Sequence, residues 1–268
     1  MKYTNIYVAC HKQANLPITS KLYTPIQVGT RHTKQITTYL TDDTGEHISS
    51  KNPFYSELTG WYWIWKNENH DIVGTSHYRR FFTTKESRAT YLKSAIKFAA
   101  GLHKKRYGLY YTRNIDKWKN HILDSEDVTK LLKSYDIILP QQKVFKYSVE
   151  KQYAKRHRIE DLKLMEQIVQ EQTPDYYSSF KEVLGGNRLY SFNMFITSWE
   201  LFDNYMSWLF PLLFELEKRS NILVNDTYQK RVCAFMAERL QNVWLHKTQL
   251  KTKELPVIYF KKCKEDHF

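Results

Sequence analysis

The stretch ISSKNPFYSELTGWYWIWKNENHDIVGTSHYRRFF, residues 48–82, decides the fold of this chain. Its first half is rich in Trp and Tyr and predicts a helix over residues 56–67, with Ser56 as an N-cap candidate, although the boundary could lie nearer Asn52. Its second half predicts a short apolar strand over residues 71–74. A helix that leads into a buried strand is typical of α/β proteins, and this class is what the stretch indicates.

A histidine and two arginines follow this strand directly. The strand runs into His77, Tyr78, Arg79 and Arg80. Ligands of open α/β sheets bind in the crevice at the carboxyl ends of the strands, and guanidinium groups bind phosphates bidentately. Because Arg79 and Arg80 are neighbours on an extended segment, their side chains should point to opposite sides. We therefore expect one of them to reach an anionic ligand.

Three further apolar runs complete the expected sheet, over residues 6–10, 135–140 and 189–196. Helical patterns separate these runs, and the predicted helices cover residues 124–133, 150–170, 199–219 and 227–245. The first strand ends at His11 and Lys12, so a second basic pair lies at a strand's carboxyl end. The sequence therefore predicts an α/β fold with a central mixed sheet flanked by helices.

The chain contains no internal repeat and no low-complexity linker, so a single domain is expected. We place this domain at residues 1–246 and interpret residues 83–119 as a basic insertion, partly helical around residues 92–102. Residues 247–268 are expected to form a basic C-terminal tail that ends in a short strand.

Composition limits the classes of function. The 268 residues carry a formal charge of +13, which favours anionic partners such as nucleic acid, an acidic membrane surface or phosphorylated substrates. No helix-turn-helix, zinc-finger or RNP-like motif is present, which disfavours a nucleic-acid-binding protein. A metal-dependent hydrolase is disfavoured because His and Asp do not occur with metal-ligand spacing.

Cysteine usage and hydropathy bear on location. Cys10, Cys233 and Cys263 are scattered and form no CxxC motif, which suggests a reducing cytosol. The N-terminal apolar run is too short for a signal peptide, and the apolar segment 206–216 is too short to span a bilayer. We expect a cytoplasmic protein that is soluble or lies peripherally on the cytoplasmic face of the membrane.

Several motifs, in this order and spacing, resemble a known family. They are Tyr7-Val8-Ala9-Cys10-His11-Lys12, Asp43-Thr44-Gly45, Ile48-Ser49-Ser50-Lys51-Asn52, Glu57-Leu58-Thr59-Gly60, Tyr62-Trp63, Trp65-Lys66-Asn67, Gly74, His77-Tyr78-Arg79-Arg80-Phe81, Asn193-Met194-Phe195-Ile196 and Glu238-Arg239-Leu240. The chain resembles DUF4422, a family of bacterial capsular and exopolysaccharide glycosyltransferases, over residues 3–246. The resemblance implies a GT-A-like fold, and some members look like galactofuranosyltransferases.

The resemblance implies a hexosyltransferase-type enzyme of capsule, exopolysaccharide or O-antigen biosynthesis. Such an enzyme would move a sugar, such as galactofuranose or a hexose, from a UDP-sugar to a lipid-linked oligosaccharide. The acceptor's lipid diphosphate lies in an anionic leaflet, so the anionic inner-membrane surface is an expected partner of this basic protein. Nucleic acid is not an expected partner.

Glycosyl transfer needs cations or a metal at the departing diphosphate, a base for the attacking hydroxyl, and a cleft. The catalytic candidates are Glu57, His77, Arg79, Arg80 and Glu238. The donor-binding candidates are His11, Lys12, Asp43, Lys51, Asn52, Arg79, Arg80 and Arg239. The acceptor-binding candidates are His157, Asp161 and Asn193. Asp42 and Asp43 are the candidates for binding a divalent metal such as Mn or Mg.

Several of these residues have a structural alternative. The base could be Glu57, Asp43, Asp161 or Glu238, although Glu238 could instead pair with the adjacent Arg239. His77 could hydrogen-bond a backbone carbonyl. His157 and Asp161 are four residues apart, which would put them on one helix face, either as a dyad or as solvated side chains.

Overall fold

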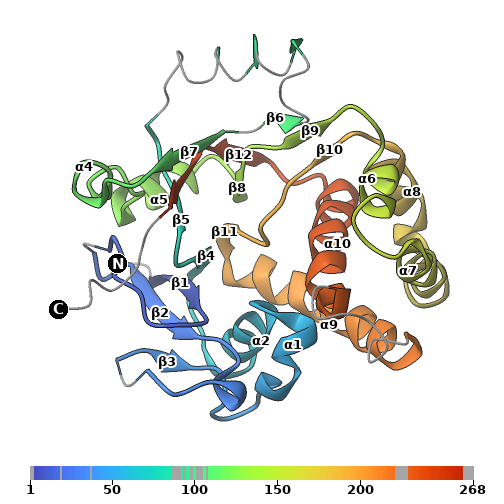
Figure 1. Cartoon of the computed structure of the whole chain (residues 1–268), viewed down its shortest axis with the longest axis horizontal. Helices are drawn as coiled ribbons and strands as arrows, with labels where there is room; N and C mark the ends of the chain where they lie inside the picture. Colours follow the sequence, from blue (N-terminus) through green and yellow to red (C-terminus); the bar gives the residue numbers. More distant parts are fainter. Residues whose placement is uncertain are drawn as a thin grey trace.

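The computed structural model describes residues 3–18, 20–36, 38–85, 92, 95–96, 99–100, 105–106, 108–220 and 229–261. Within these residues the chain forms a large sheet with helices packed against it, which confirms the predicted α/β fold (Figure 1). In the described part of the chain, no helix combines the length and the apolar character needed to cross a bilayer.

The main sheet is mixed. Its described strands are β1 (Thr4–Cys10), β2 (Tyr23–Gln27), β3 (Leu40–Thr41), β4 (Ile72–His77), β5 (Arg80–Phe82), β7 (Leu109–Thr112), β8 (Ile137–Pro140), β11 (Ile196–Ser198), β12 (Thr252–Leu255) and β13 (Val257–Phe260). The central order is β12-β8-β11-β4-β1-β2-β3. β1 pairs in parallel with both β2 and β4, whereas β11 runs antiparallel to both of its neighbours. A small second sheet joins β6 (Lys105–Arg106), β9 (Lys143–Phe145) and β10 (Arg188–Leu189).

The sheet separates two apolar cores, and β1 contributes to both. Tyr7 and Ala9 face the larger core, whereas Ile6, Val8 and Cys10 face the smaller one. A strand covered on both faces needs apolar residues at every position, which explains the continuous run that the sequence has here. The strand predictions at β1, β4 and β8 are therefore confirmed.

Helices of the larger core cover one face of the sheet. They are α1 (Asn52–Tyr55), α2 (Leu58–Asn67), α6 (Val149–Ala154), α7 (Ile159–Gln172), α8 (Tyr177–Gly185), α9 (Trp199–Arg219) and α10 (Val232–Thr248). The other face carries α4 (Ile115–Lys119) and α5 (Ser125–Leu131). Short 3-10 turns are η1 (Thr30–His32), η2 (Ser49–Lys51), η3 (Pro174–Tyr176) and η5 (Gln229–Arg231). Helix α9 confirms its predicted bounds.

The aromatic stretch docks α2 into the larger core. Trp61 is fully buried, and Trp65 stacks on Phe210 of α9 with ring centroids 5.8 Å apart. The helix begins at Leu58, however, because Ser56 has a φ of 50° that separates α1 from α2. Ser56 is therefore not an N-cap, and the alternative boundary near Asn52 agrees with the start of α1.

Two predicted elements are broken in the structure. The expected strand over residues 189–196 divides into β10 and β11, because Phe192 and Asn193 adopt positive φ and form a turn between them. The expected helix over residues 150–170 divides into α6 and α7. His157 lies in the connection, so it does not share a helix face with Asp161.

The segments predicted to be peripheral contribute to the sheet where they are described. β7 lies within the expected insertion 83–119 and pairs in parallel with β13. The segment after residue 246, expected to be a tail, completes α10 and supplies β12 and β13. The helix expected around residues 92–102 falls mostly outside the described residues.

The Asp42 carboxylate connects three loops near the ends of the parallel strands. Asp42 is fully buried and accepts hydrogen bonds from the backbone N–H groups of Gly29, at 2.7 Å, and Thr30, at 3.1 Å. It also accepts from the hydroxyls of Ser49, at 2.6 Å, and Thr59, at 2.5 Å. The side chain therefore ties the end of β2 to η2 and to the first turn of α2.

We expect Asp42→Asn to destabilise the protein, because an amide presents N–H groups to donors that need acceptors. Each buried donor left unsatisfied costs roughly 1–3 kcal/mol. The free energy of unfolding, measured by urea denaturation, should fall clearly. The control is Asp43→Asn, whose part-exposed carboxylate lies 3.8 Å from Arg31 and should change stability by less than about 1 kcal/mol. Equal stabilities of Asp42→Asn and the wild type would contradict this role.

Candidate active site

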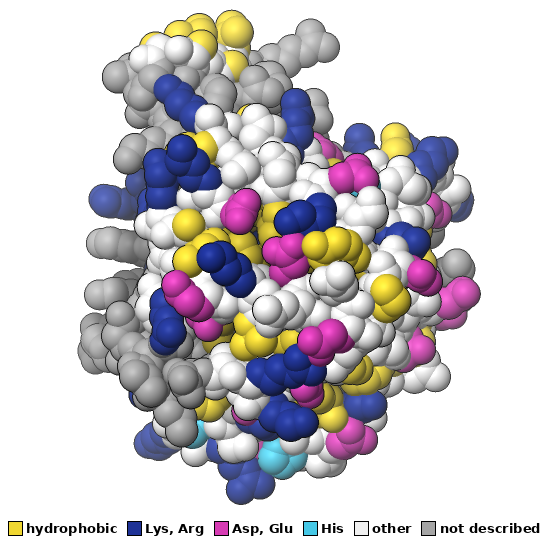
Figure 2. All heavy atoms as spheres, turned by 90° about the vertical axis from the view of Figure 1, so that its right-hand side faces the viewer, with side chains coloured by type: hydrophobic (Ala, Val, Ile, Leu, Met, Phe, Trp, Pro, Cys, Tyr) yellow, Lys and Arg dark blue, Asp and Glu magenta, His cyan; other side chains and the backbone are white. Residues whose placement is uncertain are grey.

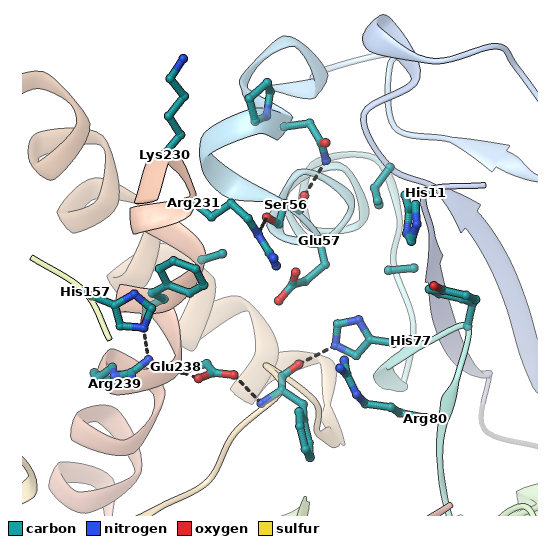
Figure 3. A pocket seen from close by; sticks show the side chains of 18 of the residues that line it. His11, Ser56, Glu57, His77, Arg80, His157, Lys230, Arg231, Glu238 and Arg239 are labelled. Carbon is teal, nitrogen blue, oxygen red and sulfur yellow. Dashed lines mark hydrogen bonds and ion pairs between the residues drawn. The ribbon is translucent and has the colours of Figure 1, made fainter. Parts of the chain in front are cut away.

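A cavity of about 700 Å³ opens at the carboxyl ends of the parallel strands. Its lining residues come from both halves of the chain and are Ala9, His11, Val28, Asn52, Pro53, Ser56, Glu57, His77, Tyr78, Arg80, Lys143, His157, Phe192, Lys230, Arg231, Ala234, Phe235, Glu238 and Arg239. The first strands supply one wall, and the N-terminal half of α10 supplies the opposite wall (Figure 3). This is the edge at which open α/β sheets bind ligands.

The charge of the lining favours an anionic ligand. Five lining side chains are Lys or Arg and two are carboxylates. Arg80 and Lys143 both lie over the ring of Phe192, with the guanidinium carbon 4.6 Å and the ammonium nitrogen 4.4 Å from its centroid. Arg231 donates from Nε to the Ser56 hydroxyl at 2.8 Å. These cations converge on one cavity from β5, β9 and η5, as a bound diphosphate would require.

Glu57 precedes α2, and Figure 3 shows its carboxylate pointing into the cavity. Its Oε1 accepts a hydrogen bond of 2.8 Å from Nδ2 of Asn193. Ser56, the residue before it, has positive φ, as do Phe192 and Asn193. Backbone strain of this kind persists where the surrounding structure enforces it, and it clusters at functional sites.

His77 forms a hydrogen bond with the backbone of Phe192 on the opposite wall of the cavity. Its Nε2 donates to the carbonyl oxygen of Phe192 at 2.6 Å, the structural alternative considered for this residue. Burial lowers the pKa of His77, and the nearby Arg80 lowers it further. The imidazole is therefore neutral near pH 7, and its fixed Nε2–H helps to hold the Phe192 turn.

Glu238 holds the same turn from the other side. It accepts the backbone N–H of Phe192 at 2.8 Å and lies 3.2 Å from Nη1 of Arg239. Burial would raise the pKa of Glu238, but Lys143 and Arg239 outweigh it and the net pKa is lowered. The buried Arg239 also donates to Gln152 Oε1 at 2.6 Å. Glu238 is thus an ionised, bonded carboxylate with little capacity to accept another proton.

Two other histidines line the cavity. His157 packs on Phe235, with ring centroids 4.0 Å apart, and burial followed by Arg239 lowers its pKa to about 4. Burial and the neighbouring Lys12 lower the pKa of His11, whose ring meets the edge of Tyr78. Both imidazoles are neutral at pH 7, so Lys and Arg supply the positive charge of the cavity.

The structure brings together many, but not all, of the predicted site residues. Those that line the cavity are His11, Asn52, Glu57, His77, Arg80, His157, Glu238 and Arg239. Lys12, Asp42, Asp43, Lys51, Arg79, Asp161 and Asn193 do not line it. Asn193 reaches the site through Glu57, as described above.

Four of the residues outside the cavity have other contacts. Lys51 binds Glu217 of α9 at 2.6 Å, and Asp43 lies near Arg31. Arg79 stacks on Tyr78, with its guanidinium carbon 4.9 Å from the ring centroid. Asp161 is buried in α7, where burial raises its pKa.

Sequence reasoning missed Lys143, Lys230, Arg231, Phe235 and Phe192 as lining residues. Lys143 follows the strand β8 after a short turn, so a basic residue just beyond a predicted strand was an available signal. Arg231 was expected inside the helix predicted over residues 227–245, but it ends η5, directly before α10 begins at Val232. Phe192 gave no signal, because its place in a turn depends on partners far away in the sequence.

The residues present do not fit a divalent-metal site of the acidic-pair type. The Asp42 carboxylate is saturated by four donors within the protein. Among the residues that the structure describes, no cluster of three or more His, Cys, Asp or Glu side chains could hold a metal ion.

The fold and the cavity define an α/β protein with a cation-rich ligand site at the carboxyl edge of its sheet. The chain belongs to the DUF4422 family, described as a domain of unknown function, which matches residues 5–249. This confirms the predicted family.

A solved structure of WbbM, a bifunctional glycosyltransferase, is 29% identical to this chain, with a TM-score of 0.82. The similarity covers 97% of this chain and 46% of the WbbM chain, so this chain spans about half of WbbM. This structural similarity confirms the expected fold, because the matched part of WbbM has the same fold as this chain. A search of curated proteins found no match.

The low pKa of His157 gives a testable dependence of stability on pH. In the unfolded chain, His157 has an ordinary pKa of about 6.5 and is protonated below that pH. In the folded chain its pKa is about 4, so the imidazole stays neutral until the pH falls to that value. The free energy of unfolding should therefore decrease as the pH falls from 7 toward 4. In His157→Gln this decrease should be smaller, as measured by urea denaturation at several pH values. The control is His32→Gln, at an exposed histidine. An unchanged slope in His157→Gln would contradict the assignment.

Proposed function

We propose that this chain is a glycosyltransferase that transfers a sugar from a UDP-sugar to a saccharide acceptor. The observation that carries the proposal is the cavity at the sheet edge, where five cationic side chains surround two carboxylates. A nucleotide-sugar donor needs cations for its diphosphate, and its acceptor needs a base. The similarity to a bifunctional glycosyltransferase over nearly the whole chain supports this reading of the cavity.

Arg80, Lys143 and Arg231 are the proposed ligands of the donor diphosphate. They line the cavity from separate elements, and a diphosphate placed between them would bring its charge near each cation. When the bond between the sugar and the diphosphate breaks, negative charge accumulates on the leaving UDP. Cations already fixed at that position stabilise this charge without reorganisation.

Glu57 is the proposed base. Of the two lining carboxylates, Glu238 is committed to the Phe192 N–H and to Arg239, and its pKa is lowered. Glu57 points into the cavity, and within the described residues its carboxylate has one hydrogen-bond partner, Asn193 (Figure 3). In an inverting transfer, Glu57 would take the proton of the acceptor hydroxyl as its oxygen attacks the anomeric carbon. UDP would leave with the bonding electron pair from the opposite side.

The acceptor and location are further parts of the proposal. We infer a lipid-linked oligosaccharide acceptor of capsule, exopolysaccharide or O-antigen assembly, with galactofuranose or a hexose as the transferred sugar. The support is the net charge of +13, which suits an anionic leaflet, together with the similarity to a glycosyltransferase. The protein would then act in the cytoplasm, peripherally on the inner face of the membrane.

A panel of UDP-sugars, each with and without Mn or Mg, tests the activity and the metal requirement together. Release of UDP from one donor, with or without metal, is the expected result. UDP should also raise the melting temperature of the protein by mass action. If DNA raised the melting temperature and UDP did not, and if salt abolished the effect of DNA, the protein would instead bind nucleic acid.

Arg80 provides the sharpest mutational test. Arg80→Ala should lower turnover about a hundredfold to a thousandfold, as expected when a contact made chiefly in the transition state is lost. Arg80→Lys should restore only part of this, because an ammonium lacks the planar fork of a guanidinium. Arg79→Ala serves for comparison, since Arg79 lies on Tyr78 outside the cavity lining, and should retain turnover within several-fold. Normal turnover in Arg80→Ala would move the diphosphate site elsewhere.

The proposed membrane contact lies beside the parallel pair of strands β7 and β13. Figure 2 shows a face where Lys and Arg alternate with Asp and Glu, which gives no single basic patch there. At the ends of β7 and β13, in contrast, the Lys261 ammonium lies 5.3 Å from the ring centroid of Tyr111, and Arg113 is exposed two residues after Tyr111. Tyr and basic side chains together suit a membrane interface. The sequence also carries Lys104, Lys105, Arg106 and Lys262, but the described part of the structure does not include their side chains.

We expect binding to vesicles that contain anionic lipid, measured by co-sedimentation, to weaken steeply with salt. The double variant Arg113→Glu/Lys261→Glu should bind much less well at low salt, because two attractive charges become repulsive. A matched variant, Lys163→Glu/Lys181→Glu on the helical side of the protein, should bind more nearly as the wild type does. Equal binding to neutral and anionic vesicles would contradict the electrostatic contact.

A further inference from the structure

The orientation of the Asn193 side chain is fixed by its partners. Nδ2 donates to Oε1 of Glu57 at 2.8 Å and lies 3.4 Å from the carbonyl oxygen of Ala234. Both partners are acceptors, so a flipped amide would place Oδ1 against two oxygens. The amide nitrogen therefore holds one oxygen of the Glu57 carboxylate and leaves the other oxygen to the cavity.

The backbone that presents this amide is strained and restrained. Phe192 has a φ of 84° and Asn193 a φ of 50°, in a region that a bulky residue such as Phe rarely adopts. His77 Nε2 donates to the Phe192 carbonyl at 2.6 Å, and Glu238 accepts the Phe192 N–H at 2.8 Å. The Thr75 hydroxyl donates to the carbonyl of Asn193 at 3.1 Å. The turn is thus held from β4 on one side and from α10 on the other.

Asn193 also leaves a polar atom unsatisfied. The residue is 4% exposed, and its Oδ1 has no hydrogen-bond partner in the described part of the chain. A buried acceptor without a donor and two consecutive positive φ values all disfavour the folded state. Fold stability alone does not account for these features, whereas a need to place Nδ2 against Glu57 would explain why the turn is kept.

We infer that Asn193 is a positioning residue, which aims the Glu57 carboxylate at the acceptor hydroxyl, and that the strained turn serves to place its amide. The inference rests on the proposed function, with Glu57 as the base. A base must lie within hydrogen-bond reach of the proton that it removes, and a displacement of about 1 Å can cost a factor of about a hundred in rate. His77 and Glu238 act through this turn, one step further from the reacting atoms.

The variant Asn193→Gly tests the role of the side chain apart from that of the backbone turn. Glycine adopts positive φ without a Cβ penalty, so this variant preserves the turn and removes only the amide. We expect its kcat for sugar transfer to fall about tenfold to a hundredfold, with the affinity for UDP, measured by calorimetry, and the melting temperature close to those of the wild type. Asn193→Asp, which puts a second carboxylate beside Glu57, should lose at least as much turnover. The control is Asn187→Ala, since Asn187 is exposed and bonds the Phe145 carbonyl away from the cavity.

The outcomes distinguish this inference from the proposed function. If the wild type transfers sugar and Asn193→Gly does so at the same kcat, Asn193 serves only the turn and the inference is wrong. If Asn193→Gly loses UDP affinity and melting temperature together with turnover, its role is structural and the inference is also wrong. If the wild type binds no UDP and transfers no sugar, the proposed function fails and this inference fails with it.

Discussion

The buried carboxylate of Asp42 is the constraint on which one wall of the cavity depends. Its four hydrogen bonds tie the end of β2 to η2 and to the start of α2. Asn52 and Glu57 lie on the segments that it fixes, and both line the cavity. Burial of a carboxylate is costly unless hydrogen bonds replace those that it would make with water, and these four do so. The same hydrogen bonds fix the geometry of the loops that supply the donors. The residue that looked most like a metal ligand thus organises the backbone around the site.

The opposite wall depends on a turn that the rest of the fold holds in place. His77 and Glu238, from β4 and α10, bind the two polar atoms of the Phe192 backbone. Because these elements meet only when the sheet and α10 have packed together, the turn forms only in the complete tertiary structure. Tertiary packing therefore supplies the free energy that keeps two residues in a left-handed conformation beside Glu57.

Burial and charge together divide the titratable groups of the cavity by role. The pKa values of His11, His77 and His157 are lowered, so these rings remain neutral beside the cations. The same cations lower the pKa of Glu238 although partial burial opposes this, so its carboxylate stays ionised. The positive potential therefore comes from Lys and Arg, whose charge does not change near neutral pH. This arrangement suits an anionic ligand. Of the two lining carboxylates, Glu57 has fewer hydrogen-bond and ion-pair partners than Glu238 among the described residues.

The sequence by itself determined the class of fold, the family and much of the cavity's composition. Apolar runs identified β1, β4 and β8, because strands covered on both faces need apolar residues throughout. Basic residues just beyond strand ends pointed to His11 and Arg80, because the strands of an α/β sheet bring their carboxyl ends to one edge. The family resemblance added Glu57, Glu238 and Arg239 to this set.

Only the tertiary structure decided what each of these residues contacts. Nothing local to Phe192 predicts a positive φ, since its restraints come from His77 and Glu238, distant in sequence. The sequence could not show that Asp42 holds backbone and hydroxyl donors and is not a metal ligand, because those donors come from other loops. It also could not show which of Arg79 and Arg80 lines the cavity. Local patterns fix periodicity and burial, but hydrogen bonds between distant segments fix roles, because they exist only after the chain has folded.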